Sequence, residues 1–292
     1  MTTPAAAAVP PIWVRVFAVI QPTPEQYAVL TRMERISCRA GDVFSRRLPW
    51  LSLAVNRMWG MWVVRAFVGR RLVAHGIEHL RHVDRADRLL LVANHRSFFD
   101  FFVVVWMLWH RTRAPRRLLM PVRAPYFYSR PTGPLVNLAM SGFSMFPPLL
   151  RDEGRGRVFN SFSQARMVEE IARPGTIMGM HPEGTRNKGD DPYSFLPAKP
   201  GTGRIIRRAP GLTVVPVFVH GLTNDGWKEL RLSWTRPSRY PIDIAYGEPI
   251  DFADLLALPD ERDTHVRIVE RCMKRIAELA EQQRARRARL SG

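Results

Sequence analysis

Five short apolar runs, separated mostly by helix-length stretches, dominate the sequence from about Leu72 onward and limit the folds open to it. The runs cover residues 89–93, 118–122, 176–180, 214–219 and 242–246. Their alternation with helical stretches is typical of βαβ units. It predicts an α/β fold with a mixed, mostly parallel sheet flanked by helices. Because proline lacks an N–H group, Pro216 predicts that its strand lies at an edge of the sheet or that the proline lies near a strand end.

Apolar periodicity outside those runs predicts helices. The expected helices cover residues 24–47, 50–68, 98–109, 158–172 and about 266–280. Pro174 and Gly175 end the fourth of them, and the last runs into a cluster of arginines. The expected regions are an N-terminal helical, membrane-associating region (1–71), a central α/β domain (72–255) and a C-terminal basic helix (256–292).

The helix expected over residues 50–68 is unusually apolar. Its two arginines, Arg57 and Arg65, lie about 80° apart around a regular helix axis, which leaves most of the remaining surface apolar. Trp50 and Trp62 suit a membrane interface. A helix of about 18 residues is about 27 Å long, but each arginine at mid-bilayer would cost about 2.5 to 3.5 kcal/mol. Shallow insertion into a membrane is therefore one expectation, burial under the central domain is the alternative, and no transmembrane helix is expected.

The chain is strongly basic, with 44 lysine and arginine residues against 26 aspartate and glutamate residues. Such a charge favours a polyanionic partner: nucleic acid, anionic lipid or an acidic carrier protein. Forty of the 44 are arginine, a bias that a GC-rich genome also produces, so charge alone does not identify the partner. The two cysteines, Cys38 and Cys272, argue against a disulfide framework. The first ten residues lack the basic start and apolar run of a signal peptide.

The polar sequence NHRSFFD occupies residues 94–100, where a buried strand is expected to end and an apolar helix to begin. Proteins of the α/β class place functional sites at such junctions. His95 is suited to accept a proton at neutral pH, and a carboxylate on its other ring nitrogen, such as that of Asp100, would fix its tautomer. Ser97 and Asp100 also fit a helix capping box. A catalytic pair and a simple cap are therefore alternatives here.

A second polar sequence, HPEGTR at residues 181–186, follows the apolar run 176–180. Its glycine turn, threonine hydroxyl and arginine can bind a phosphate, and Glu183 can orient the arginine or a substrate hydroxyl. Lys199, at the start of the next expected helix, adds a further anion contact. The alternative is a solvated turn with a Glu–Arg pair.

The sequence HGIEH at residues 75–79 has the spacing of a zinc-protease pattern, which needs both histidines on one face of a helix. Gly76 and the absence of helical periodicity favour a polar strand or turn instead. We expect no metal ion and no cofactor.

In this order and spacing, NHRSFFD, HPEGTR and the run VVPVFV at 214–219 resemble the glycerolipid acyltransferase family, which includes 1-acylglycerol-3-phosphate acyltransferases. The resemblance covers about residues 76–221. It implies that His95 is the general base and that Asp100 is its partner. The residues that it implies as ligands of the glycerol phosphate are Glu183, Gly184, Thr185 and Arg186.

Two positions depart from the family pattern. A block that usually ends in an arginine after a short strand corresponds to residues 142–151, where two prolines stand in the place of the strand. Arg151 is the candidate phosphate ligand from this block, with Arg155 or Arg157 as substitutes. His181 stands where family members commonly carry phenylalanine, and we assign it no catalytic role.

The resemblance implies transfer of an acyl group from acyl-CoA or an acyl carrier protein to the hydroxyl of a lysophospholipid, above all 1-acylglycerol-3-phosphate, which would give phosphatidate. Glycerol-3-phosphate and a lysolipid with an amino-acid head group are alternative acceptors. Because an anionic membrane surface would gather both substrates, we expect the protein at the cytoplasmic face of a membrane, peripheral or shallowly inserted. A basic, noncatalytic protein that binds a membrane or nucleic acid is a distant alternative, for which the sequence has no nucleic-acid-binding motif. A serine hydrolase is disfavoured because there is no GxSxG elbow.

Overall fold

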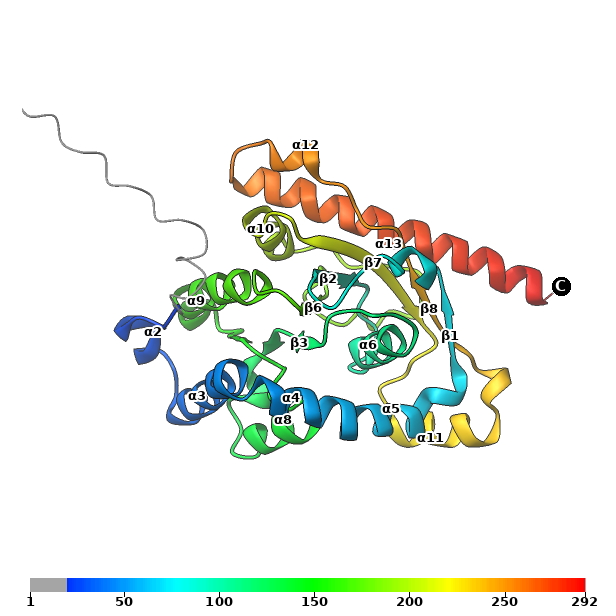
Figure 1. The fold of residues 1–292 in the computed structure, drawn as a ribbon, viewed down its shortest axis with the longest axis horizontal. Coiled ribbons are helices and arrows are strands. Elements are labelled where there is room, and N and C mark those ends of the chain that lie inside the picture. Colours follow the sequence, from blue (N-terminus) through cyan, green and yellow to red (C-terminus); the bar gives the residue numbers. More distant parts are fainter. Residues whose placement is uncertain (1–19, 292) are drawn as a thin grey trace, which may run out of the picture.

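A six-stranded sheet forms the centre of the protein, whose computed structural model describes residues 20–291 (Figure 1). In spatial order the strands are β1 (Leu72–His75), β8 (Ile242–Tyr246), β7 (Thr213–His220), β2 (Arg88–Ala93), β6 (Thr176–Met180) and β3 (Arg117–Leu119). All neighbouring strands are parallel except β7 and β8. The expected α/β fold with a mixed, mostly parallel sheet is confirmed. Our expectation about a signal peptide concerns residues that lie outside the described ones.

Helices cover both faces of this sheet. The α-helices are α2 (Pro24–Ala28), α3 (Arg32–Arg47), α4 (Pro49–Val55), α5 (Met61–Val68), α6 (Asp100–Arg111), α7 (Ala124–Phe127), α8 (Gly133–Ser141), α9 (Glu153–Ile171), α10 (Gly201–Arg208), α11 (Gly226–Thr235), α12 (Ala253–Leu256) and α13 (Arg262–Ser291). A π-helix η1 (Asn56–Gly60) and three 3₁₀ turns, η2 (Gly69–Arg71), η3 (Ile77–Leu80) and η4 (Pro237–Arg239), complete the elements. Figure 1 shows α10 and α13 on one side of the sheet and α6 on the other, with α4, α5 and α11 beyond α6.

The single strand expected over residues 118–122 is wrong. It divides into β3, which pairs with β6, and β4 (Val122–Arg123), which pairs with β5 (Pro148–Leu149) in a separate two-stranded sheet. Pro121 lies between the two and has no N–H group to continue a ladder. The other four apolar runs are confirmed as β2, β6, β7 and β8.

Both alternatives expected for Pro216 are wrong, because β7 lies between β8 and β2 and Pro216 is the fourth of its eight residues. The antiparallel register with β8 begins at Val217, which is opposite Tyr246. Pro216 precedes that pair, and its carbonyl accepts a hydrogen bond from the Gly247 N–H (2.9 Å). A proline is tolerated in a central strand here because it lies just outside the antiparallel ladder.

The helix expected over residues 24–47 is two helices, α2 and α3. The break follows from local capping: the Thr31 hydroxyl accepts from the Glu34 N–H, and the Glu34 carboxylate accepts from the Thr31 N–H. This reciprocal capping box starts a new helix at Arg32. Leu30, in the turn between the helices, is buried.

The helix expected over residues 50–68 is present but contains the π-helix η1 between α4 and α5. Asn56, at the start of η1, is buried and its amide donates to the Ser52 and Ser141 carbonyls and the Ser144 hydroxyl. One face of the helix therefore packs against the protein, as the burial alternative expected. Trp50 and Trp62 on the opposite side remain exposed.

The final helix, α13, packs against β7, β8 and α10. The expected apolar face is confirmed by Val269, Ile276 and Ala280, which are buried. Cys38 and Cys272 are buried free thiols. Within residues 20–291, no helix combines the length and the hydropathy that crossing a membrane requires. The boundaries drawn at residues 71 and 255 stay predictions.

Candidate functional site

The loop after β2 is fixed to the neighbouring strand β7 by the side chain of Asn94. This buried amide donates to the Val219 carbonyl (3.0 Å) and accepts from the Val219 N–H (2.8 Å). The Asn94 amide thus makes the two hydrogen bonds that a backbone N–H and C=O would make in a sheet, and it continues the pairing with β7 beyond the end of β2. His95, the next residue, therefore has a defined place at the carboxyl edge of the sheet.

His95 and Asp100 are brought together, as expected. His95 Nδ1 lies 3.2 Å from Asp100 Oδ2, and the same oxygen accepts the N–H groups of Arg96 and Ser97 at 2.9 Å each. An ionised carboxylate only accepts, so Nδ1 carries the proton and Nε2 keeps its lone pair. One carboxylate oxygen thus holds both the base and the backbone of its loop.

The expected N-cap role of Ser97 is wrong. Helix α6 begins at Asp100 with Phe99 as its N-cap, and no side chain caps it. The Ser97 hydroxyl instead donates to the Thr223 carbonyl (2.7 Å). The chain turns between His95 and the helix, and this turn allows His95 to meet Asp100 although they are five positions apart.

The side chain of Glu183 joins the loop after β6 to the loop that carries His95. Its carboxylate is buried and accepts the His95 N–H (2.8 Å) with one oxygen and the Leu196 N–H (2.8 Å) with the other. Both oxygens accept from backbone groups, so Glu183 supports the backbone of His95, and its contact with the glycerol phosphate stays a prediction. Burial raises the pKa of the Glu183 carboxyl, and these two hydrogen bonds oppose that rise.

Among the other residues of the second motif, Arg186 is close enough to His95 for its charge to lower the pKa of the imidazole. Arg186 is exposed and donates to the Asn224 side chain (2.8 Å). Gly184 has a left-handed backbone (φ 65°), and a Cβ there would lie 3.2 Å from Cγ of Lys199. Lys199 is therefore beside the turn, as expected. Thr185 is half-buried in the same turn.

Arg123 is a site residue that the sequence analysis missed. It is the last residue of β4 and donates a hydrogen bond to the Gly184 carbonyl. Burial, with the nearby charges of Arg151 and Arg186, lowers the pKa of its guanidinium. The three arginines thus form a cationic cluster (Arg123, Arg151 and Arg186). Arg123 directly follows the apolar run 118–122. A polar residue in such a position is the same signal that pointed to the NHRSFFD sequence, and it would have found Arg123.

Of the substitutes considered for Arg151, Arg155 lies elsewhere. It forms an ion pair with Glu34 and donates to the Val29 carbonyl (2.7 Å). It therefore joins α9 to the N-terminal helices. Arg151 itself is exposed and lines a surface depression with Arg157 and Arg204. The structure consequently places Arg151, but not Arg155, in the cationic cluster.

Burial and neighbouring charge determine the protonation of the pair. Burial, Arg186 and Arg123 lower the pKa of His95 to about 4. Burial raises the pKa of Asp100 to about 6, against the hydrogen bonds that favour its ionised form. At neutral pH, His95 is therefore neutral and Asp100 ionised, which is the combination that a general base needs.

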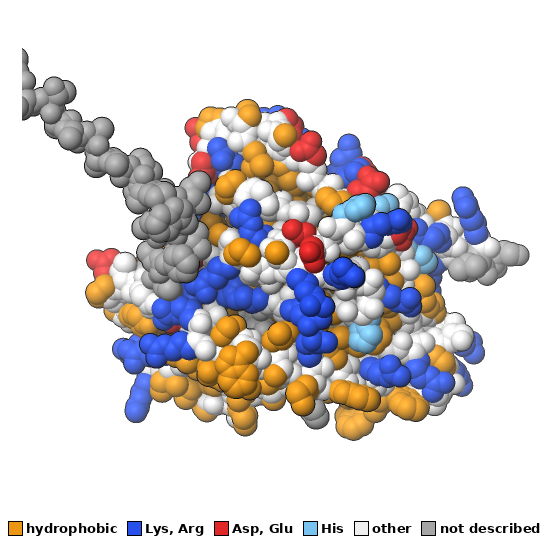
Figure 2. Space-filling model, viewed as in Figure 1, with side chains coloured by type: hydrophobic (Ala, Val, Ile, Leu, Met, Phe, Trp, Pro, Cys, Tyr) orange, Lys and Arg blue, Asp and Glu red, His pale blue; other side chains and the backbone are white. Residues whose placement is uncertain are grey.

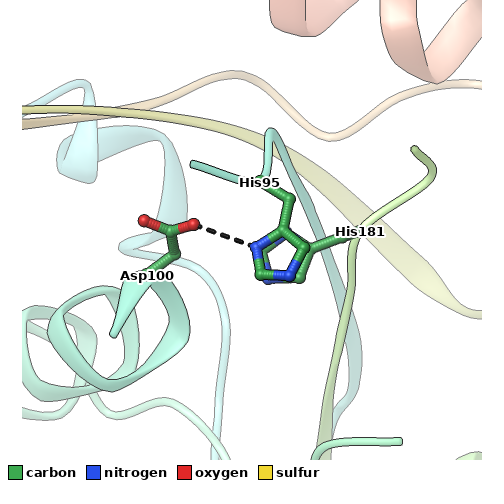
Figure 3. A group of neighbouring side chains, drawn as sticks. All are labelled: His95, Asp100 and His181. Atoms are coloured by element: carbon green, nitrogen blue, oxygen red, sulfur yellow. Dashed lines mark hydrogen bonds and ion pairs between the residues drawn. The ribbon is translucent and has the colours of Figure 1, made fainter. Parts of the chain in front are cut away.

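His181 completes the group drawn in Figure 3. Its ring stacks on that of His95, with centroids 3.7 Å apart and planes at 7°. Within residues 20–291, the ligand atoms of His95, Asp100 and His181 form the one group close enough to suggest a metal site. The nitrogen lone pairs of two parallel rings point along parallel planes and do not converge on one ion. The HGIEH sequence also lacks the helix that a zinc-protease pattern needs. His75 is the last residue of β1, Gly76 has a left-handed backbone, and a 3₁₀ turn follows.

The chain is similar to a known family and to a solved structure. No curated protein matches the sequence. Among solved structures, the 1-acyl-sn-glycerophosphate acyltransferase PlsC of Thermotoga maritima is similar with a TM-score of 0.43 and 14% identity, over 87% of this chain and 86% of that one. The Acyltransferase family model matches residues 71–220, which contain both motifs and make up about half of the chain. The chain therefore belongs to the Acyltransferase family.

Proposed function

We propose that this acyltransferase moves a fatty acyl group from acyl-CoA or an acylated carrier protein to the free hydroxyl of 1-acylglycerol-3-phosphate, giving phosphatidate. The observation that carries the proposal is the combination of a base and a cationic cluster in one place. His95 is held by Asp100 at 3.2 Å, and Arg123 and Arg186 are close enough to lower the pKa of the His95 imidazole. A hydroxyl and a phosphate on one acceptor would suit this arrangement.

The proposed reaction needs one proton carrier. His95 Nε2 takes the proton of the acceptor hydroxyl while the oxygen attacks the carbonyl carbon of the thioester. As the new C–O bond forms, the C–S bond breaks, and the sulfur leaves with its electron pair and receives the proton from His95. A positioned base contributes about 10² to 10⁴-fold to such a step, and holding the two substrates together contributes the rest.

The cationic cluster supports a phosphorylated acceptor. Guanidinium groups bind phosphate through paired, charge-assisted hydrogen bonds. Because Arg186 is fixed by Asn224 (2.8 Å) and Arg123 by the Gly184 carbonyl, both cations are held in place before a ligand arrives. Lys199 borders the same turn. An uncharged acceptor would leave these charges without a counter-ion.

An apolar cavity of about 180 Å³ beside the site supports a long-chain substrate. It begins at Phe99, directly before Asp100, and lies between α5, α6, α8 and α11. Its lining residues are Gly60, Val63, Val64, Phe67, Val68, Phe99, Phe102, Val103, Met140, Gly226 and Glu229. A hydrocarbon chain gains free energy by leaving water for such a surface.

We also propose that the enzyme works at the cytoplasmic face of a membrane, bound through a tryptophan face made of Trp50, Met58, Trp62, Trp227 and Trp234. These side chains, on α4, η1, α5 and α11, are 60 to 78% exposed. Figure 2 shows hydrophobic side chains along the lower edge of the molecule, where Figure 1 places these helices, with lysines and arginines above them. Exposed tryptophans beside positive charge suit an anionic lipid surface.

The first experiment measures thiol release from a long-chain acyl-CoA in detergent micelles, with and without 1-acylglycerol-3-phosphate. The wild type should release thiol only with the acceptor and should form a diacyl product, and His95→Ala should abolish both. His110→Ala serves as the control, because His110 lies at the far end of α6 from Asp100.

Two results would contradict the proposed function. Thiol release without an acceptor would indicate a thioesterase. A wild type that is inactive with CoA and carrier-protein donors, and with glycerol-3-phosphate and lysolipid acceptors as well, would leave acyl transfer to these substrates without support.

The membrane proposal has its own test, sedimentation with lipid vesicles. The protein should pellet with vesicles that contain phosphatidylglycerol more than with phosphatidylcholine alone, and less at high salt. Replacing both Trp50 and Trp62 with serine should reduce the pelleted fraction, whereas Val158→Ser, at an exposed position on α9, should not. Equal pelleting by all three proteins would contradict it.

A further inference from the structure

The ring stack between His95 and His181 follows from the sheet. Strands β2 and β6 are parallel neighbours, and Val92 is opposite Met180 in the register. The residues that continue the two strands therefore lie side by side. With centroids 3.7 Å apart and planes at 7°, the two imidazoles are in flat contact (Figure 3).

His181 is itself held from two directions. Its Nδ1 donates a hydrogen bond to the Ala93 carbonyl at the end of β2 (3.0 Å). The ring of Phe101, from α6, packs against it with centroids 4.2 Å apart. Gly179 admits this phenylalanine, because a Cβ at that position would lie 2.8 Å from the Phe101 ring. The His181 ring is thus a fixed surface under the base.

The ring contact with His181 restrains the orientation of His95 in a way that the hydrogen bond to Asp100 alone does not. The hydrogen bond to Asp100 restrains one atom, Nδ1, at the edge of the ring, whereas the contact with His181 restrains the plane of the ring. We propose that His181 is a positioning residue: it holds the plane of His95 so that Nε2 stays directed at the acceptor hydroxyl. The proposal rests on the proposed function of His95 as the base.

Burial keeps His181 neutral, against the charge of Asp100, which favours the protonated ring. Burial is the main cause that lowers its pKa, to about 3, and His95 contributes next. The charged groups that face the pair are Asp100 from α6, Glu183 and Arg186 from the loop after β6, and Arg123 from β4. A neutral ring does not compete with His95 for the proton, so His181 acts through its shape and contact alone.

Three substitutions separate this role from a general packing role. His181→Phe keeps a flat ring, His181→Leu keeps most of the volume without one, and His181→Ala removes both. We expect kcat to fall about 10- to 100-fold in the leucine and alanine variants with KM little changed, as small misplacements of a catalytic group do. The phenylalanine variant should stay within about threefold of the wild type, because it restores the flat surface.

A titration of His95 by NMR gives a second readout that needs no substrate. In the wild type, His95 should titrate well below its ordinary pKa of 6.5, at about 4. His181→Ala would open one face of the ring to water and relieve the burial, so the pKa of His95 should rise toward 6.5. His181→Phe should leave it low. The His95→Gln variant identifies the signal.

His110 provides a matched control. It stacks on Trp106 with centroids 4.0 Å apart, and its Nδ1 lies 3.0 Å from the Trp106 carbonyl, outside the site. His110→Ala should change neither kcat nor the titration of His95. A kcat and titration like the wild type in His181→Ala would overturn the proposal, and so would a phenylalanine variant as impaired as the leucine variant. If the wild type transfers no acyl group, the proposed function fails, whereas the titration still tests the contact.

Discussion

The substitution Asp100→Asn should slow acyl transfer only moderately. Asp100 Oδ2 accepts all three hydrogen bonds of this side chain, and Oδ1 has no partner among the described residues. The asparagine oxygen should take the Oδ2 position, because an NH₂ group there would face the N–H groups of Arg96 and Ser97. His95 then keeps its tautomer and loses only the negative charge of its partner.

The size of the effect follows from that difference. A hydrogen bond to a charged group contributes about 1.5 to 3 kcal/mol, and one between neutral groups about 0.5 to 1.5 kcal/mol. Losing about 1 to 2 kcal/mol of imidazolium stabilisation lowers kcat by about 5- to 30-fold.

Steady-state thiol release with saturating acceptor measures the loss. Asp87→Asn is the control, since its carboxylate bonds only to the Asp84 N–H at the opposite end of β2. A loss of about 10⁴-fold, as when a base is locked in the wrong tautomer, would refute the reasoning about the shared oxygen.

Four further predictions concern binding, stability and chain length. Arg123→Gln should raise KM for 1-acylglycerol-3-phosphate about 10-fold or more and leave KM for monoacylglycerol unchanged, since one charge-assisted bond to phosphate is lost. Arg71→Met should lower the free energy of unfolding by about 3 to 5 kcal/mol in urea titrations, because the buried Glu229 carboxylate loses its ion-pair partner. The free energy of unfolding should also fall as pH drops from about 6.5 to 4. Burial lowers the pKa values of His95, His181 and His220, so the unfolded chain binds more protons than the folded one over this range. The raised pKa of Asp100 offsets only part of this effect. Urea titrations at the two ends of that range measure the change. Gly60→Leu should shift the acyl preference toward shorter chains in a competition assay, because Gly60 lines the apolar cavity.

The central strands were predictable from the sequence because each is a continuous apolar run that ends at a polar cluster. Strands buried on both faces have that pattern, and β2, β6 and β8 show it with burial of nearly every residue. The pairing of His95 with Asp100 could be expected from the polar cluster that ends β2 together with the family resemblance. The contact between His95 and His181 could not, since it depends on β2 and β6 being neighbours, and strand order is not local information.

The role of Glu183 shows a second limit of motif reasoning. A carboxylate in a polar turn suggests contact with a substrate, yet both of its oxygens accept backbone N–H groups. One of these belongs to His95, which is 88 positions earlier in the chain. The sequence of the motif does not show that a backbone N–H group of a distant loop needs Glu183 as its acceptor.

The helix over residues 50–68 shows why the packed side of an apolar helix is hard to predict from the sequence. Mean hydropathy reports that a helix is apolar, but it does not distinguish the side that packs against protein from the side that stays exposed. The distinguishing residue is Asn56, because a buried amide needs partners and finds three in the polypeptide. Its π-helical turn also alters the 100° spacing on which a regular helical wheel depends. Trp50 and Trp62 remain exposed beside it, so a polar residue marks the packed face and the tryptophans mark the free one.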